Sequence, residues 1–154
     1  MSQIHHATCT LEDMIRQSDL IVVVNKTQPF RRIRNKRISL LPWKKPFPTI
    51  FHCYQVEEIL FQKSTSNLIQ PATHIAVRMA HFHQKLVVHK KYYNSGLRKS
   101  PIYSQYDGEM DPAEADRMII FCRREAPDGI LQYVMENAFE AESKRKEIEK
   151  IVAE

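Results

Sequence analysis

Two segments of this sequence, residues 27–48 and 84–104, combine cationic and aromatic side chains. These are the side chains best suited to bind a partner. The predicted partner-binding residues are Arg31, Arg32, Arg34, Arg37, Trp43 and Lys44 in the first segment and Lys90, Lys91, Tyr92, Tyr93 and Arg98 in the second. Cations of this kind hold phosphate or carboxylate groups, while aromatic rings stack on bases or fill protein interfaces. The alternative is that the rings belong to the core and the lysines are simply solvated.

The histidines offer a weaker chemical signal. His81 and His83 fall on one side of an expected strand, close enough to share a metal ion, with His89 farther on. No Cys, Asp or Glu lies between Glu58 and Asp107 to complete a ligand set from nearby. We therefore predict no cofactor and no metal, with His81 and His83 as the weak candidates.

Other possible reaction centres lack a necessary part. The H-x-T unit at His6 needs a second such unit for two-histidine phosphoesterase chemistry, and the sequence has none. The acidic residues between Asp107 and Asp116 do not follow the spacing of a calcium loop. The three cysteines are far apart and without C-x-x-C spacing, which predicts reduced thiols. We expect that the protein is not an enzyme.

The charges separate along the chain. Residues 20–106 carry 15 basic and two acidic side chains, a net charge of +13, while residues 107–154 carry seven basic and 13 acidic ones, a net charge of −6. Such a division favours an acidic partner for the central segment, or an internal match to the acidic C-terminal segment.

The elements that position these residues follow from hydrophobic periodicity. Thr10 to Asp13 forms a capping box, which predicts a short helix that ends at Ser18 and Asp19. The expected strands are 20–24, 49–60, 75–79, 117–122 and 130–135, and a helix is expected over 138–152. The run 20–24 has no polar alternation, so both of its faces should be covered. Five strands and flanking helices predict a mainly β (α+β) fold, an OB-like, partly closed antiparallel barrel with a short N-terminal and a longer C-terminal helix.

Three hydrophobic patterns resemble a known group of proteins. They are Ser18 to Val23, Tyr54 to Leu60, and Arg117 to Phe121 with Tyr133 and Val134 after a turn. Together they resemble the small bacterial OB-like barrels related in shape to netrin and metalloproteinase-inhibitor modules. The resemblance implies a non-catalytic barrel that presents loops to a partner. Metalloproteinase inhibition does not carry over, because it needs an N-terminal cysteine and Cys9 is internal.

We therefore predict one domain over residues 1–154 that acts as a protein-binding module of the immunity or inhibitor type and docks on an acidic protein surface. The alternative is an OB-type protein that binds single-stranded nucleic acid with the same loops. Residues 1–10 do not resemble a secretory signal and no segment has the length of a membrane span, so we expect a bacterial cytoplasmic protein without membrane contact. The sequence leaves the oligomeric state open.

Overall fold

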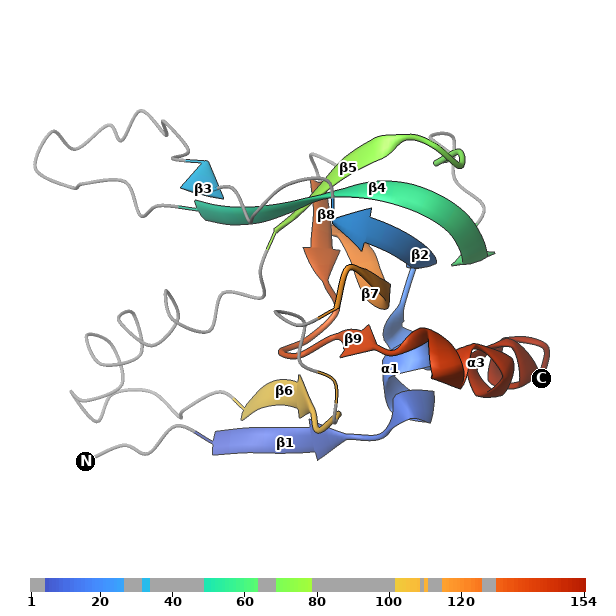
Figure 1. The fold of residues 1–154 in the computed structure, drawn as a ribbon. Coiled ribbons are helices and arrows are strands. Elements are labelled where there is room, and N and C mark those ends of the chain that lie inside the picture. Colours follow the sequence, from blue (N-terminus) through green and yellow to red (C-terminus); the bar gives the residue numbers. More distant parts are fainter. Residues whose placement is uncertain are drawn as a thin grey trace, which may run out of the picture.

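The computed structural model describes residues 5–26, 32–33, 49–63, 69–78, 102–108, 110, 115–125 and 130–154, and its central feature is a closed five-stranded barrel (Figure 1). The barrel strands are β2 (Leu20–Lys26), β4 (Thr49–Gln62), β5 (His74–Arg78), β7 (Arg117–Glu125) and β8 (Ile130–Tyr133). Their spatial order is β2-β4-β5-β8-β7, and β7 pairs with β2 to close the ring. This confirms the predicted mainly β, OB-like five-stranded barrel with an N-terminal and a C-terminal helix. Four of the five pairings are antiparallel, while β5 and β8 meet in parallel at Arg78 and Gln132.

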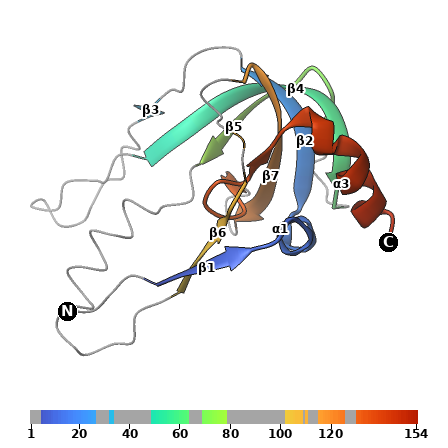
Figure 2. The same ribbon diagram turned by 60° about the horizontal axis from the view of Figure 1, so that its bottom comes forward.

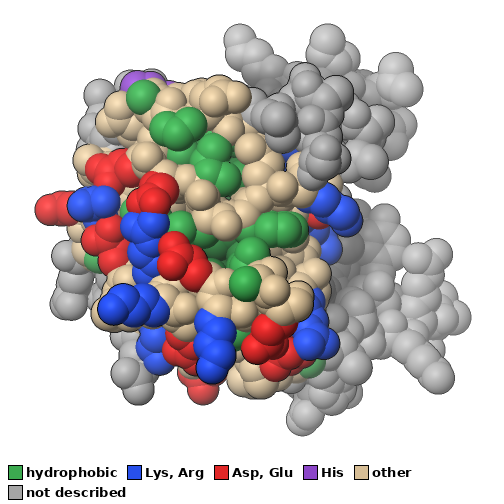
Figure 3. Space-filling model, turned by 90° about the vertical axis from the view of Figure 1, so that its right-hand side faces the viewer, with side chains coloured by type: hydrophobic (Ala, Val, Ile, Leu, Met, Phe, Trp, Pro, Cys, Tyr) green, Lys and Arg blue, Asp and Glu red, His purple; other side chains and the backbone are tan. Residues whose placement is uncertain are grey.

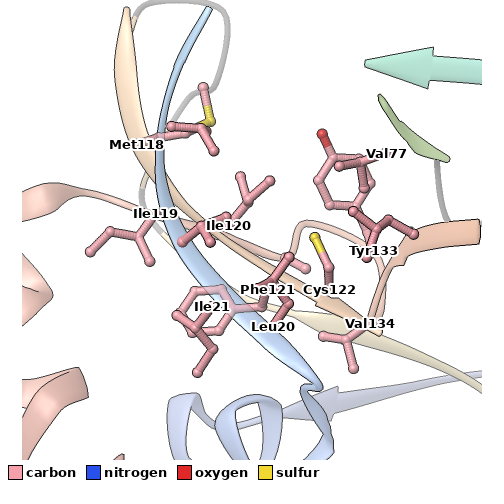
Figure 4. Packing of buried hydrophobic residues seen from close by; sticks show 14 of the residues in the cluster. Leu20, Ile21, Val77, Met118, Ile119, Ile120, Phe121, Cys122, Tyr133 and Val134 are labelled. Atoms are coloured by element: carbon pink, nitrogen blue, oxygen red, sulfur yellow. The ribbon is translucent and has the colours of Figure 1, made fainter. Parts of the chain in front are cut away.

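Strand β2 lies between β4 and β7, and residues Leu20 to Val24 are at most 1% exposed. Figure 4 shows why the neighbouring strand β7 is also apolar on both faces. Ile120 and Cys122 lie on the same side of β7 as Tyr133, whereas Ile119 and Phe121 lie on the other side. Strand β9 (Phe139–Glu140) pairs with β7 at Ile119 and Ile120 and extends the sheet beside it. Burial on both faces therefore explains the missing polar alternation, as predicted.

The helix α1 (Leu11–Gln17) begins where the sequence indicated. The Thr10 hydroxyl accepts a hydrogen bond from the Asp13 amide, and the Asp13 carboxylate accepts one from the Thr10 amide, completing the capping box. Met14 and Ile15 are the buried residues of the helix. The chain leaves the helix at Ser18 and enters β2 at once, which places α1 against the lower end of the barrel (Figure 1).

The prediction of a C-terminal helix over 138–152 is wrong for the first half of that range. Residues 139–140 form β9, residues 142–144 form a single 3-10 turn, η1 (Glu142–Lys144), and the α-helix α3 runs only over Arg145–Val152. Asn137 has a positive φ of 58°, which turns the chain back toward β7. Glu140 is buried and accepts a hydrogen bond from the Tyr106 hydroxyl, so its side chain points inward and not to the exposed side of a helix.

A second, two-stranded sheet was not expected from the sequence. Strand β1 (His5–Cys9) pairs in parallel with β6 (Ile102–Tyr106), without a break in register. Figure 2 shows this sheet beside the barrel, next to α1. The amide of Tyr106 also donates to the Glu136 carbonyl, which ties the sheet to the chain just before β9. The H-x-T unit at His6 thus lies on a strand of this small sheet.

The sequence also predicts an extra strand near 86–88, a helical turn at 111–114 and a hairpin turn through 127–129, and all three lie outside the described residues. The pairing of Glu125 with Ile130 nevertheless shows that β7 and β8 form the expected antiparallel hairpin. In the part of the chain that the structure describes, the helices are all too short and too polar to qualify as membrane spans.

Candidate functional site

The two basic segments join the barrel at one end. Strand β2 ends at Lys26, β4 begins at Thr49, and β5 ends at Arg78. Lys26 pairs with Tyr54 of β4, and Phe51 of β4 pairs with Arg78. Segment 27–48 therefore leaves the barrel and returns to it at one end. The chain leaves the barrel toward segment 84–104 at that same end. We call this end, defined by the end of β2, the start of β4 and the end of β5, the basic end.

One predicted binding residue is placed by its backbone at the basic end. Arg32 belongs to β3 (Arg32–Ile33) and pairs with Ile50 at the start of β4. The other predicted residues lie outside the described residues, and so do both histidines suggested as weak metal ligands. These are Arg31, Arg34, Arg37, Trp43, Lys44, Lys90, Lys91, Tyr92, Tyr93 and Arg98, together with His81 and His83.

The outward face of β4 and β5 carries an aromatic residue and a cationic residue on neighbouring strands at this end. Phe51 and Arg78 are directly opposite in the antiparallel register, and both are half-buried. The Arg78 guanidinium donates to Oε1 of Gln132 from Nη2 at 2.7 Å and from Nε at 3.2 Å, which fixes its plane. Sequence analysis did not select these two residues. The period-two pattern of both strands, which places alternate residues outside, was the signal that could have found them.

The inward face of the same end holds a buried polar cluster. Nδ1 of His52 is hydrogen-bonded to the Tyr133 hydroxyl at 2.7 Å, and the Tyr133 hydroxyl is in turn hydrogen-bonded to that of Tyr54. Burial lowers the pKa of His52 to about 4, and the charge of Lys26 adds to the effect. Burial also raises the pKa of both tyrosines. The cluster is therefore neutral at pH 7 and hydrogen-bonded within the barrel, which makes it a structural element rather than a source of charge.

The two acidic residues of the central segment form ion pairs with arginines of the C-terminal segment. Glu57 pairs with Arg117 at 2.5 Å, and Glu58 makes a two-pronged pair with Arg145. Hydrogen bonding to Arg145 lowers the pKa of Glu58. These are the only two carboxylates in residues 20–106, and both are bound by arginines of the C-terminal segment.

Carboxylates of the C-terminal segment form ion pairs with cations of the same segment. Glu142 pairs with Arg117 at 3.0 Å, Glu149 with Arg145 at 2.9 Å and Glu147 with Lys144 at 3.7 Å. Each of these three pairs joins two residues of the segment 107–154. Among the ion pairs described here, none links a carboxylate of residues 107–154 to a cation of the central segment.

Within the described ranges, no group of three or more His, Cys, Asp and Glu side chains is arranged to hold a metal ion. Cys9, Cys53 and Cys122 are free thiols, and burial raises the pKa of Cys122. Comparison of the chain with protein-family models, curated proteins and solved structures found no match.

Proposed function

We propose that this protein is a non-catalytic binding module of the bacterial cytoplasm, which docks the basic end of its barrel on an acidic protein surface, as an immunity or inhibitor protein does. The observation that carries the proposal is the pairing of Glu57 and Glu58 with Arg117 and Arg145. Because the central segment's only carboxylates are bound by arginines from outside it, they do not neutralise that segment's own cations. Electrostatic complementarity of this kind speeds encounter and selects partners.

We expect that replacing Arg31, Arg32, Arg34 and Arg37 together by glutamine weakens partner binding at least tenfold, because four attractive charges are lost. The wild-type chain is used to isolate a stoichiometric partner from its native host, and the affinity of the purified pair is then measured at low and high salt. A matched control replaces Lys144, Lys146 and Lys150 of the C-terminal segment by glutamine. An unchanged affinity in the arginine variant, or equal loss in both variants, would contradict the proposal.

A second candidate function, binding of single-stranded nucleic acid, is favoured by one specific observation. OB-type barrels bind oligonucleotides on the outer face of their second and third strands. In this barrel those strands are β4 and β5, and their outer face carries Phe51 and Arg78 on neighbouring strands, with the Arg78 guanidinium bonded to Gln132 of β8. An aromatic ring and a cation on one face can stack a base and hold a backbone phosphate.

For that candidate, Phe51→Ala should cost about 1 to 2 kcal/mol of binding free energy, because one stacking platform is lost. Arg78→Gln should lower the slope of log affinity against log salt by about one. The measurement is fluorescence anisotropy with a labelled single-stranded oligonucleotide of about 15 nucleotides, with Lys144→Gln as the control. Absence of binding by the wild-type chain at low salt would exclude this function and leave the protein-binding proposal in place.

A further inference from the structure

A hollow of about 320 Å³ lies at the far end of β4 from the basic end, where α1 and the end of α3 meet the barrel. It is lined by Ile15, Arg16, Ser18, Phe61, Lys63, Ile151, Val152 and Glu154. We call it the α1–α3 pocket. Figure 3 shows the side of the molecule on which it lies, with hydrophobic side chains in a band across the middle and charged side chains along its lower and left borders.

Half of the residues that line the α1–α3 pocket are apolar. Ile15 is buried beneath it, and Phe61, Ile151 and Val152 pack against the core while remaining partly exposed. Three large apolar side chains around one hollow leave hydrocarbon in contact with water, which favours an apolar occupant. Ser18 is not a strong polar contact for such an occupant, because its hydroxyl already donates to the Met14 carbonyl.

The rim of the pocket carries two cations that a ligand can recruit. The Lys63 ammonium lies 3.8 Å from Asp19, beyond hydrogen-bonding distance, and its side chain is 70% exposed. Arg16 bonds to Glu12 of the same helix through Nη2, and its side chain is 71% exposed. Surface pairs of this kind contribute about 0 to 1 kcal/mol, so an incoming carboxylate can replace either anion. Glu154 also lines the pocket and repels anions, so a ligand with one negative charge is disfavoured less than a ligand with several.

We propose that the α1–α3 pocket binds an aliphatic monocarboxylate, with its hydrocarbon chain against Phe61, Ile151 and Val152 and its carboxylate beside Lys63 and Arg16. The volume equals that of about ten liquid water molecules, and a methylene group fills a similar space, so the pocket accommodates a chain of about ten carbons. The site is independent of the proposed function, because the basic segments join the barrel at the opposite end of β4.

The probe is decanoate, titrated into the full chain below its micellar concentration and followed through the chemical shifts of backbone amides. The wild-type chain should bind it saturably at one site, with the shifts confined to α1, α3 and the end of β4. Lys63→Gln should bind about fivefold more weakly, and so should the wild-type chain with decanol in place of decanoate. Val152→Trp should abolish binding by filling the pocket, while Lys144→Gln should bind as the wild type does.

Two results would overturn the inference. Shifts that never saturate, or binding that survives in folded Val152→Trp, would show that the pocket is not the site. Equal affinities for decanoate and decanol, with no effect of Lys63→Gln, would show that no carboxylate is recognised. Circular dichroism on each variant checks that the fold is retained, and Ile151→Phe provides a milder filling variant in case tryptophan unfolds the chain.

Discussion

Replacement of Tyr106 by phenylalanine is expected to lower the free energy of unfolding by about 2 to 3 kcal/mol, because a buried carboxylate then loses a hydrogen-bond donor. The Tyr106 side chain is 9% exposed and Glu140 is 4% exposed, and the tyrosine hydroxyl donates to Oε2 of Glu140. The other oxygen of Glu140 accepts from the amide of Ala141. Since Tyr106 ends β6 and Glu140 ends β9, this bond and the one from the Tyr106 amide to the Glu136 carbonyl join the small sheet to the barrel.

Urea denaturation of the wild type, Tyr106→Phe, Glu140→Gln and the double variant tests this expectation. Glu140→Gln keeps an acceptor without the charge, so its loss should be smaller, and the two changes should not be additive. Faster amide hydrogen exchange in β1 and β6 of Tyr106→Phe would show that the small sheet loosens first. A loss below about 0.5 kcal/mol, or strict additivity in the double variant, would rule out the proposed role of the bond.

The same bond shows why the C-terminal part of the chain was predicted incorrectly. Local composition over 138–152 favours a helix, and only α3 follows that preference. Glu140 is instead drawn inward by Tyr106, which is 34 residues earlier in the sequence, and Asn137 supplies the positive φ that the turn requires. A tertiary contact at this distance leaves no periodic trace in the sequence, so propensity alone cannot reveal it.

Elements specified by neighbouring residues were predicted well. The capping box at Thr10 fixes the start of α1, and the apolar run of β2 requires cover on both faces, which the barrel supplies. The candidate site likewise has a part that the sequence predicted and a part that it did not. Charge counts located the basic segments, but the pairing of Phe51 with Arg78 depends on the register between two strands, and register is not visible in either strand alone.

The second large effect expected is a loss of stability in acid, caused by His52. Its pKa is about 4 in the folded protein, against 6.5 for an ordinary histidine, because burial and the charge of Lys26 disfavour the imidazolium. Between these values the unfolded chain binds a proton that the folded chain does not. The contribution of His52 to stability is therefore complete above pH 6.5, falls as the pH decreases, and is about 3 kcal/mol lower below pH 4.

This loss can be separated from that of the carboxylates by comparing variants. His52→Gln keeps a neutral polar group near Tyr133 and cannot take up the proton, so its free energy of unfolding should fall less steeply than the wild type's between pH 6.5 and 4. His74→Gln changes an exposed histidine on the adjacent strand and serves as the control. Carboxylates titrate in all three proteins, so the difference between the curves reports the histidine alone. Parallel curves for the wild type and His52→Gln would mean that folding does not lower the pKa of His52, and they would contradict this prediction.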